Sequence, residues 1–137
     1  MTQEDIRLLI TDLSARTPYG VFVQKTEDGE YGRLISVQIP SYCVVHIEKN
    51  YWSFDEYDLS KQTIKPYLRP LSSMTEIEKE EYDKFFTTIT AKEANFGKWI
   101  SPADDVALID WYNKHHFDYR GLIPMGLALE APEGMYA

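Results

Sequence analysis

The spacing of apolar residues changes along this chain from a helical period to a strand period and back, and this constrains the fold more than any other feature. Residues 3–16 place apolar side chains at i, i+3, i+4 and i+7, which is the spacing of an amphipathic helix. These side chains are Ile6, Leu9, Ile10 and Leu13, and Thr2 is placed to cap the helix. Apolar and polar residues alternate between Tyr31 and Ile39, and a helical spacing returns after Thr75. We therefore expect a helix, then strands, then further helices.

The segment after the first helix predicts a small antiparallel β-meander. Two β-prone runs, 21–26 and 31–39, flank a run of turn-forming residues and indicate a hairpin. In the second run the residues that alternate with polar ones are Ile35, Val37 and Ile39. A third strand is predicted over 42–48. The pattern then favours a short edge strand or turn near Trp52–Phe54, followed by an extended connector that contains two prolines.

Two further helices have recognisable starts. Thr75 and Glu78 have the spacing of a capping box, and an aromatic stripe behind them predicts a helix to about Ala91. Ser101 can cap the next helix, with Pro102 at its first position and an apolar face that extends to about Phe117.

The last twenty residues contain several glycines and prolines but are too apolar for a solvated tail. We expect them to form an ordered C-terminal arm with an irregular path.

These elements predict an α+β fold with an N-terminal helix, a small antiparallel β-meander, two further helices and an ordered irregular C-terminal arm. The chain has 137 residues, 44% of them hydrophobic, which suits one domain over 1–137. No uninterrupted apolar stretch approaches the ~20 residues that cross a bilayer, so we expect no membrane contact. A single cysteine, Cys43, and an acidic start without a secretory signal favour a cytoplasmic protein.

The charge of the chain bears on its partners. The formal net charge is −8, and residues 75–137 carry most of the excess. Because nucleic-acid affinity comes largely from lysine and arginine on phosphates, we expect no nucleic acid to bind by direct phosphate contact. The sparse cluster of Lys61, Lys65 and Arg69 is interpreted as solvated loop charge. Another protein is the expected partner, and a homo-oligomer stays open.

Metal and cofactor sites are not indicated. Cys43 and His46 lie three residues apart on a predicted strand and therefore face opposite sides. His115 and His116 are adjacent on a predicted helix, about 100° apart, so that one should face inward and the other, His116, outward. We expect no metal and no cofactor. The thiol of Cys43 lies in an apolar run, where we expect it to be buried and unreactive.

The densest group of chemically useful side chains lies where the last predicted helix ends. Acid–base chemistry draws on residues of these types, so we treat five of them as candidate catalytic residues. They are His115, His116, Asp118, Tyr119 and Arg120. The alternative is structural: Asp118 pairs with Arg120 or another cation, and Gly121 lets the arm turn back. The sequence contains no Gly-x-Ser-x-Gly elbow, no Walker loop, no Gly-x-Gly-x-x-Gly fingerprint and no His-Glu-x-x-His motif.

A second candidate surface is aromatic. Four aromatic residues lie beside acidic ones in the middle of the chain, and exposed tyrosine and tryptophan are enriched at interaction hot spots. The candidate binding residues are Tyr51, Trp52, Phe54 and Tyr57. Equally, these rings could fill a thin core.

Three stretches carry a resemblance to known sequences: Leu9 to Val21, Lys65 to Thr75, and His116 to Tyr136. They resemble a family of small uncharacterised proteins from gut Bacteroidetes, some of them phage- or mobile-element-associated. The resemblance implies an origin and no activity. The function that we expect is therefore a small acidic, non-catalytic interaction or regulatory accessory protein of a mobile element, for example one that sequesters a host DNA-binding protein. The alternative is a small enzyme or metal-dependent module centred on His115 to Arg120.

Overall fold

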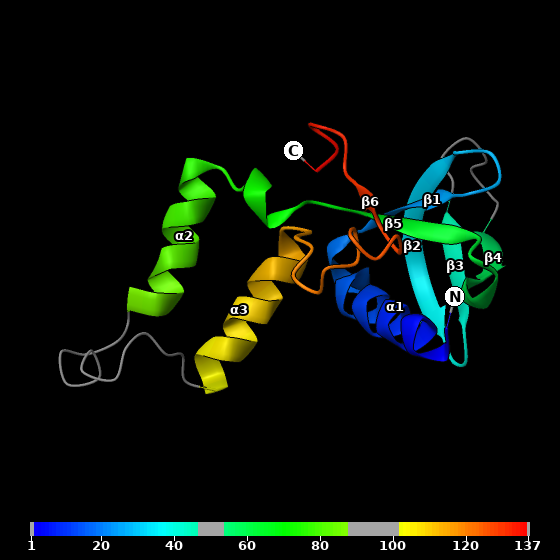
Figure 1. Cartoon of the computed structure of the whole chain (residues 1–137), viewed down its shortest axis with the longest axis horizontal. Helices are drawn as coiled ribbons and strands as arrows, with labels where there is room; N and C mark the ends of the chain where they lie inside the picture. The colour runs from blue at the N-terminus through cyan, green and yellow to red at the C-terminus, as the bar shows by residue number, and fades with distance from the viewer. Residues whose placement is uncertain (1, 47–53, 88–101, 137) are drawn as a thin grey trace.

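A computed structural model describes residues 2–46, 54–87 and 102–136. Its α+β fold combines a six-stranded sheet with an N-terminal helix and a later helix pair (Figure 1). The helices are α1 (Gln3–Arg16), α2 (Glu76–Thr87) and α3 (Pro102–Lys114). The strands are β1 (Phe22–Lys25), β2 (Tyr31–Gln38), β3 (Tyr42–His46), β4 (Phe54–Asp58), β5 (Ile64–Leu68) and β6 (Leu129–Glu130). Within the described ranges, no helix is both long and apolar enough to cross a membrane.

The first helix forms as its sequence predicts. Thr2 is the N-cap: its hydroxyl accepts a hydrogen bond from the Asp5 N–H at 3.1 Å, and the Asp5 carboxylate accepts one from the Thr2 N–H at 3.1 Å. This capping box satisfies two of the backbone donors that a helix start leaves unpaired. The helix then passes into the short 3₁₀ turn Thr17–Tyr19, and Gly20 reverses the chain with a φ of 73°.

The strands follow the order β4-β3-β2-β1-β5-β6, antiparallel except for the parallel pair β5 and β6. The predicted hairpin and third strand are confirmed. The alternation expected over 31–39 is correct for Val37, which packs against the core, but wrong for Ile35, which is 40% exposed, and for Ile39, which lies beyond β2 and is 89% exposed. An irregularity between Leu34 and Ser36 shifts the register, so that Leu34 and Val37 pair with the buried Val45 and Cys43.

The prediction of an extended connector before Pro70 is also wrong. Residues 64–68 form β5, which pairs with β1 on one side and β6 on the other. Its buried residues alternate as Ile64, Pro66 and Leu68. A short 3₁₀ turn, Leu59–Lys61, leads from β4 towards β5, although these two strands are not neighbours in the sheet. The edge strand expected near Trp52–Phe54 is β4, which begins at Phe54.

The main core lies between α1 and the inner face of the sheet. Its fully buried side chains come from α1 (Leu9, Leu13), β1 (Val23) and β2 (Leu34), among others. The C-terminal arm adds Leu122, Leu127 and Ala128, each less than a tenth exposed. The expectation of an ordered arm packed on the body is therefore confirmed.

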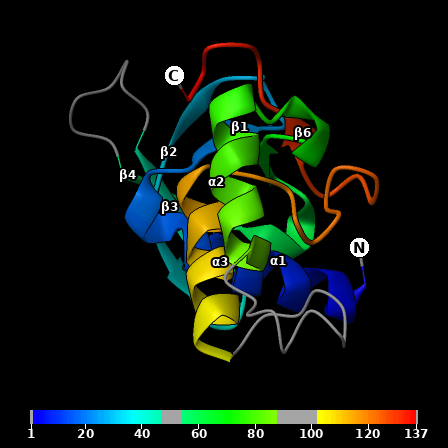
Figure 2. The same cartoon turned by 90° about the vertical axis from the view of Figure 1, so that its left-hand side faces the viewer.

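A second, largely aromatic core holds α2 against α3, which project together from the sheet body (Figures 1 and 2). Trp111, Tyr112 and Phe117 are buried there, and Tyr82 and Phe85 pack against them. The Thr75–Glu78 capping box is present, with both hydrogen bonds formed. The expected extension of α2 to Ala91, and the Ser101 cap, lie outside the described residues.

Candidate functional site

Residues 115–121, which we call the joint, connect the helix pair to the sheet body. The His116 carbonyl accepts a hydrogen bond from the Arg69 N–H at 2.8 Å, and the Asp118 N–H donates to the Arg69 carbonyl at 2.8 Å. Phe117 between them is fully buried, and the Arg69 guanidinium lies 4.3 Å from the centre of its ring. The joint therefore extends the pairing of β5 by one isolated bridge, Arg69 with Phe117.

His115 lies at the end of α3 beside two carboxylates of α2. Its Nδ1 is 3.3 Å from Glu78 Oε2, and its Nε2 is 3.7 Å from Glu81 Oε2. The ring also packs on Trp111, with centroids 4.8 Å apart. These contacts fasten the two helices together at one end.

His116 is buried, so the prediction that it faces outward is wrong. The helix ends at Lys114, and His116 takes a left-handed φ of 63°, which turns its side chain away from the helical path. Its ring stacks on Tyr136 of the arm, with centroids 3.7 Å apart. Burial, followed by the nearby Arg16 and Arg69 guanidinium groups, lowers the pKa of His116 to about 4. The imidazole is therefore neutral at physiological pH.

Asp118 does not pair with Arg120, which corrects the expected ion pair. The Asp118 carboxylate accepts hydrogen bonds from the backbone N–H groups of Leu122 at 2.8 Å and Ile123 at 2.9 Å. Gly121 takes the left-handed conformation expected of it, with a φ of 76°. Asp118 thus holds the arm by its backbone as the arm leaves the joint.

Arg120 and Tyr119 have other partners. Arg120 Nε lies 3.3 Å from the Oδ1 atom of Asp12, across the interface with α1. The Tyr119 ring stacks on Tyr112 at 5.1 Å, and its hydroxyl donates to Asn113 Oδ1 at 3.0 Å. The five candidate catalytic side chains are therefore close in sequence, but each contacts a different structural partner.

Sequence reasoning missed the buried ion pair that supports the joint. Arg16 is fully buried, and its Nε and Nη2 donate to the two carboxylate oxygens of Asp12 at 2.7 and 3.1 Å. The same Nη2 donates to the Phe117 carbonyl at 2.6 Å. The i, i+4 spacing of Asp12 and Arg16 was a visible signal, but on an amphipathic helix such a pair ordinarily lies on the surface.

Arg69 is not the solvated loop charge that we expected, because its side chain binds Glu78 of α2 in an ion pair that we call the clamp. Its Nη1 and Nη2 donate to the two carboxylate oxygens of Glu78 at 2.8 and 2.7 Å. The Arg69 guanidinium, together with the Thr75 N–H, lowers the pKa of Glu78 to about 2. The Glu78 carboxylate therefore serves the capping box and the clamp together.

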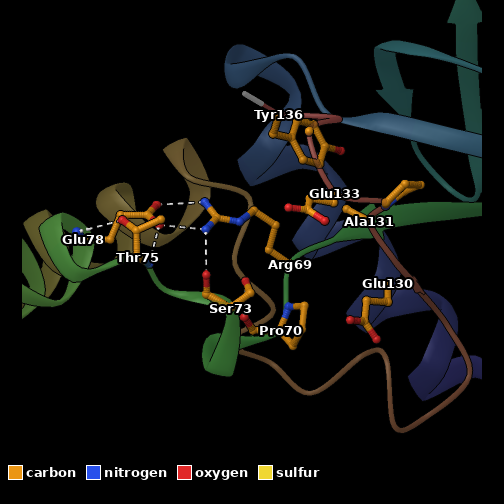
Figure 3. A pocket seen from close by; sticks show the side chains of 11 residues that line it. Arg69, Pro70, Ser73, Thr75, Glu78, Glu130, Ala131, Glu133 and Tyr136 are labelled. Carbon is orange, nitrogen blue, oxygen red and sulfur yellow. Dashed lines mark hydrogen bonds and ion pairs between the residues drawn. The ribbon is translucent and has the colours of Figure 1, made fainter.

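A groove of about 600 Å³ opens beside this clamp, between the start of α2 and the C-terminal arm (Figure 3). Its charged lining consists of Arg69, Glu78, Glu130 and Glu133. Pro70, Ala131, Pro132 and Tyr136 add apolar wall. None of residues 115–121 lines the groove. Three residues of its lining contact the joint: Tyr136 stacks on His116, Arg69 lies over Phe117, and Glu78 lies beside His115.

The remaining sequence candidates fall elsewhere. Tyr51 and Trp52 lie outside the described residues, and Phe54 begins β4. Tyr57 pairs with Cys43 and packs against the main core.

The expected burial of Cys43 is confirmed, and it raises the pKa of the thiol to about 12. Among the described residues, no cluster of three or more histidine, cysteine or acidic side chains could hold a metal ion.

Comparison with known proteins adds no relative. No family model matches the chain, and neither a curated protein nor a solved structure matches it.

Proposed function

We propose that this chain is a non-catalytic binding protein that recognises a basic segment of another protein in the groove between α2 and the C-terminal arm. The observation that carries this proposal is the state of the charges in the groove. Arg69 is neutralised by its two hydrogen bonds to Glu78. Glu130 and Glu133 form no ion pair within the described part of the chain. The groove therefore presents net negative charge to a ligand.

The lining of the groove suits a segment with long cationic side chains. In Figure 3 the Glu133 carboxylate lies between Tyr136 and Arg69, and Glu130 lies further along the same wall. Pro70 and Ala131 supply apolar surface beside these carboxylates. A lysine or arginine side chain needs this combination, because its stem is apolar and its head is charged. The net charge of −8 adds long-range attraction for a basic partner.

The walls of the groove are held in place before any ligand binds. The Ala131 N–H donates to the Leu68 carbonyl at 2.7 Å, which continues the pairing of β6 with β5. The Tyr136 hydroxyl donates to the Tyr67 carbonyl at 2.7 Å and accepts from the Phe22 N–H at 2.9 Å. A preorganised site loses less entropy on binding than a mobile one.

The alternative, a small enzyme centred on residues 115–120, finds less support. The Asp118 carboxylate is occupied by two backbone N–H groups, and the Tyr119 hydroxyl by Asn113. The His116 ring stacks on Tyr136 and does not line the groove. A catalytic group has to reach a substrate atom, and these groups are committed to holding the chain. We further propose that this binding role is that of an accessory protein of a mobile element and that it is exercised in the cytoplasm.

The test uses a defined cationic probe. A short peptide of alternating lysine and serine is titrated into the protein by calorimetry, with the same peptide carrying glutamate in place of lysine as the control ligand. We expect the lysine peptide to bind and the glutamate peptide not to bind. The variant Glu130→Gln/Glu133→Gln should weaken binding about tenfold or more, because it removes the unpaired charges of the groove.

A matched variant separates the groove from the overall charge of the protein. Glu4→Gln/Glu80→Gln removes two exposed carboxylates from α1 and α2 and changes the net charge by the same amount. This variant should bind the lysine peptide nearly as well as the wild type. Equal weakening by both variants would mean that the attraction is a property of net charge, and the proposed function would be wrong.

A further inference from the structure

The outer face of the sheet, on the side away from α1, carries an aromatic cluster. The rings of Phe22 and Tyr31 meet edge to face at 5.7 Å, and those of Tyr31 and Tyr67 at 6.3 Å. Tyr136 joins them from the arm, 5.6 Å from Phe22. Tyr31 is 54% exposed, although it lies in the middle of this cluster. We call this surface, with its neighbouring cations Arg33 and Lys65, the outer face.

The two cations lie within the same pattern of paired residues. Arg33 pairs with Phe22 in the sheet, and its guanidinium lies 5.6 Å from the centre of the Phe22 ring. Lys65 pairs with Gln24, which in turn pairs with Tyr31. Neither cation forms an ion pair within the described ranges. The protein as a whole has a net charge of −8, whereas this face combines exposed aromatic surface with unpaired positive charge.

The outer face and the groove are parts of one surface. Tyr136 packs on Phe22 of the outer face and also lines the groove that contains Glu130 and Glu133. Tyr136 therefore contacts both the aromatic cluster with its unpaired cations and the groove with its unpaired carboxylates. A surface with this arrangement is complementary to itself when it is rotated by 180° about an axis near Tyr136, which is the requirement for an isologous interface.

We propose that a second copy of this chain binds on this surface, so that the outer face of each copy meets the groove of its partner in a two-fold dimer. The inference rests on the proposed function in one respect, namely that the groove binds cationic side chains. Each copy supplies its partner with Arg33 and Lys65 and receives the partner's cations at Glu130 and Glu133. The tyrosine rings near the axis supply apolar contact area, as aromatic residues do at interaction hot spots. A basic partner protein would compete with the dimer for the same carboxylates.

Two complementary variants test this arrangement by analytical ultracentrifugation over a range of concentrations. Arg33→Glu/Lys65→Glu makes both halves of the surface acidic, and Glu130→Lys/Glu133→Lys makes both halves basic. We expect the wild type to show a concentration-dependent dimer. Each variant alone should dimerise about tenfold or more weakly, because like charges then face each other. An equimolar mixture of the two variants should form a heterodimer, since opposite charges again meet at both contacts.

Controls keep the outcome interpretable. Arg7→Glu reverses an exposed cation on α1, away from the outer face, and should dimerise as the wild type does. Circular dichroism melting establishes that each variant is folded. A wild type that stays monomeric at all concentrations, or a mixture that stays monomeric, would overturn the dimer. The outer-face variant keeps its groove, so it should still bind the lysine peptide. A wild type that binds the peptide but stays monomeric would overturn this inference alone, whereas a wild type that binds no lysine peptide would overturn the proposed function as well.

Discussion

Replacing Arg16 with methionine tests how the joint is held to α1. Methionine keeps much of the apolar stem but removes the guanidinium that donates two hydrogen bonds to Asp12 and one to the Phe117 carbonyl. The side chains of Arg16 and Asp12 are both fully buried. The substitution therefore leaves a buried carboxylate without its main cation and a buried carbonyl without its donor.

The magnitude follows from these contacts. Removing one partner of a buried ion pair costs about 3–5 kcal/mol. Arg120 Nε remains 3.3 Å from Asp12 Oδ1, which places the loss near the lower end of that range. The carbonyl of Phe117 adds about 1 kcal/mol, the usual cost of a lost hydrogen bond. We expect Arg16→Met to lower the free energy of unfolding by about 4 kcal/mol, a large share of the ~5–15 kcal/mol of a typical domain.

Urea denaturation followed by circular dichroism measures this change, with the free energy obtained by linear extrapolation. Arg16→Lys is the second variant, because it keeps the charge and loses the paired geometry, and it should cost less than Arg16→Met. The double variant Asp12→Asn/Arg16→Met should regain part of the loss, since no buried carboxylate is then left unpaired. A loss below about 1 kcal/mol for Arg16→Met, or a double variant no more stable than the single one, would refute this account of the joint.

Three further predictions concern the arm and the two titrating groups beside it. Truncation after Asp118 removes the buried Leu122 and Leu127 and should cost on the order of 3–6 kcal/mol, whereas a melting temperature within a few degrees of the intact chain would contradict the packing of the arm. In an NMR pH titration the chemical shifts of the His116 ring should change with a midpoint of about 4, whereas a midpoint near 6.5 would mean that the ring is exposed. Because the His116 side chain of the unfolded chain binds a proton near pH 6.5, the free energy of unfolding should fall as the pH drops from 6.5 to 4. The lowered pKa of Glu78, about 2, corresponds to a contribution of about 3 kcal/mol to the free energy of unfolding. This contribution is complete above the ordinary pKa of 4.5 and is lost as the pH falls towards 2. Glu78→Gln should remove this acid dependence, as measured by urea denaturation at each pH.

The sequence predicted the helix starts and the ordered arm, because these depend on residues that are close together in the chain. The Thr2 cap and the Thr75–Glu78 box lie a few residues from the groups that they satisfy, so the helix starts could be identified from the sequence. The ordered arm followed from its apolar content. The strand β5 was missed because Pro66 argues against a strand, whereas its pairing with β1 depends on residues some forty positions earlier in the chain.

The site was harder to predict because its side chains take their roles from distant partners. The sequence predicts His116 on an outward helical face, but the helix ends before it, and its ring stacks on Tyr136 of the arm. The structural reading of the sequence pairs Asp118 with a cation, whereas its carboxylate binds backbone N–H groups beyond the turn at Gly121. The groove lies between segments that are sixty residues apart in sequence, around Arg69 and Glu130, and no local pattern relates them.

We propose that ligands bind in the groove while residues 115–121 hold the fold together. The most direct measurement is an NMR titration of the isotopically labelled protein with the lysine peptide, in which each backbone amide reports on its own surroundings. We predict that the largest shift changes fall on residues 130–136 and on Arg69 to Ser73, with small changes at Tyr119 and Arg120. Largest changes at Asp118 to Arg120, with none along 130–136, would contradict the account and place the binding site at the joint.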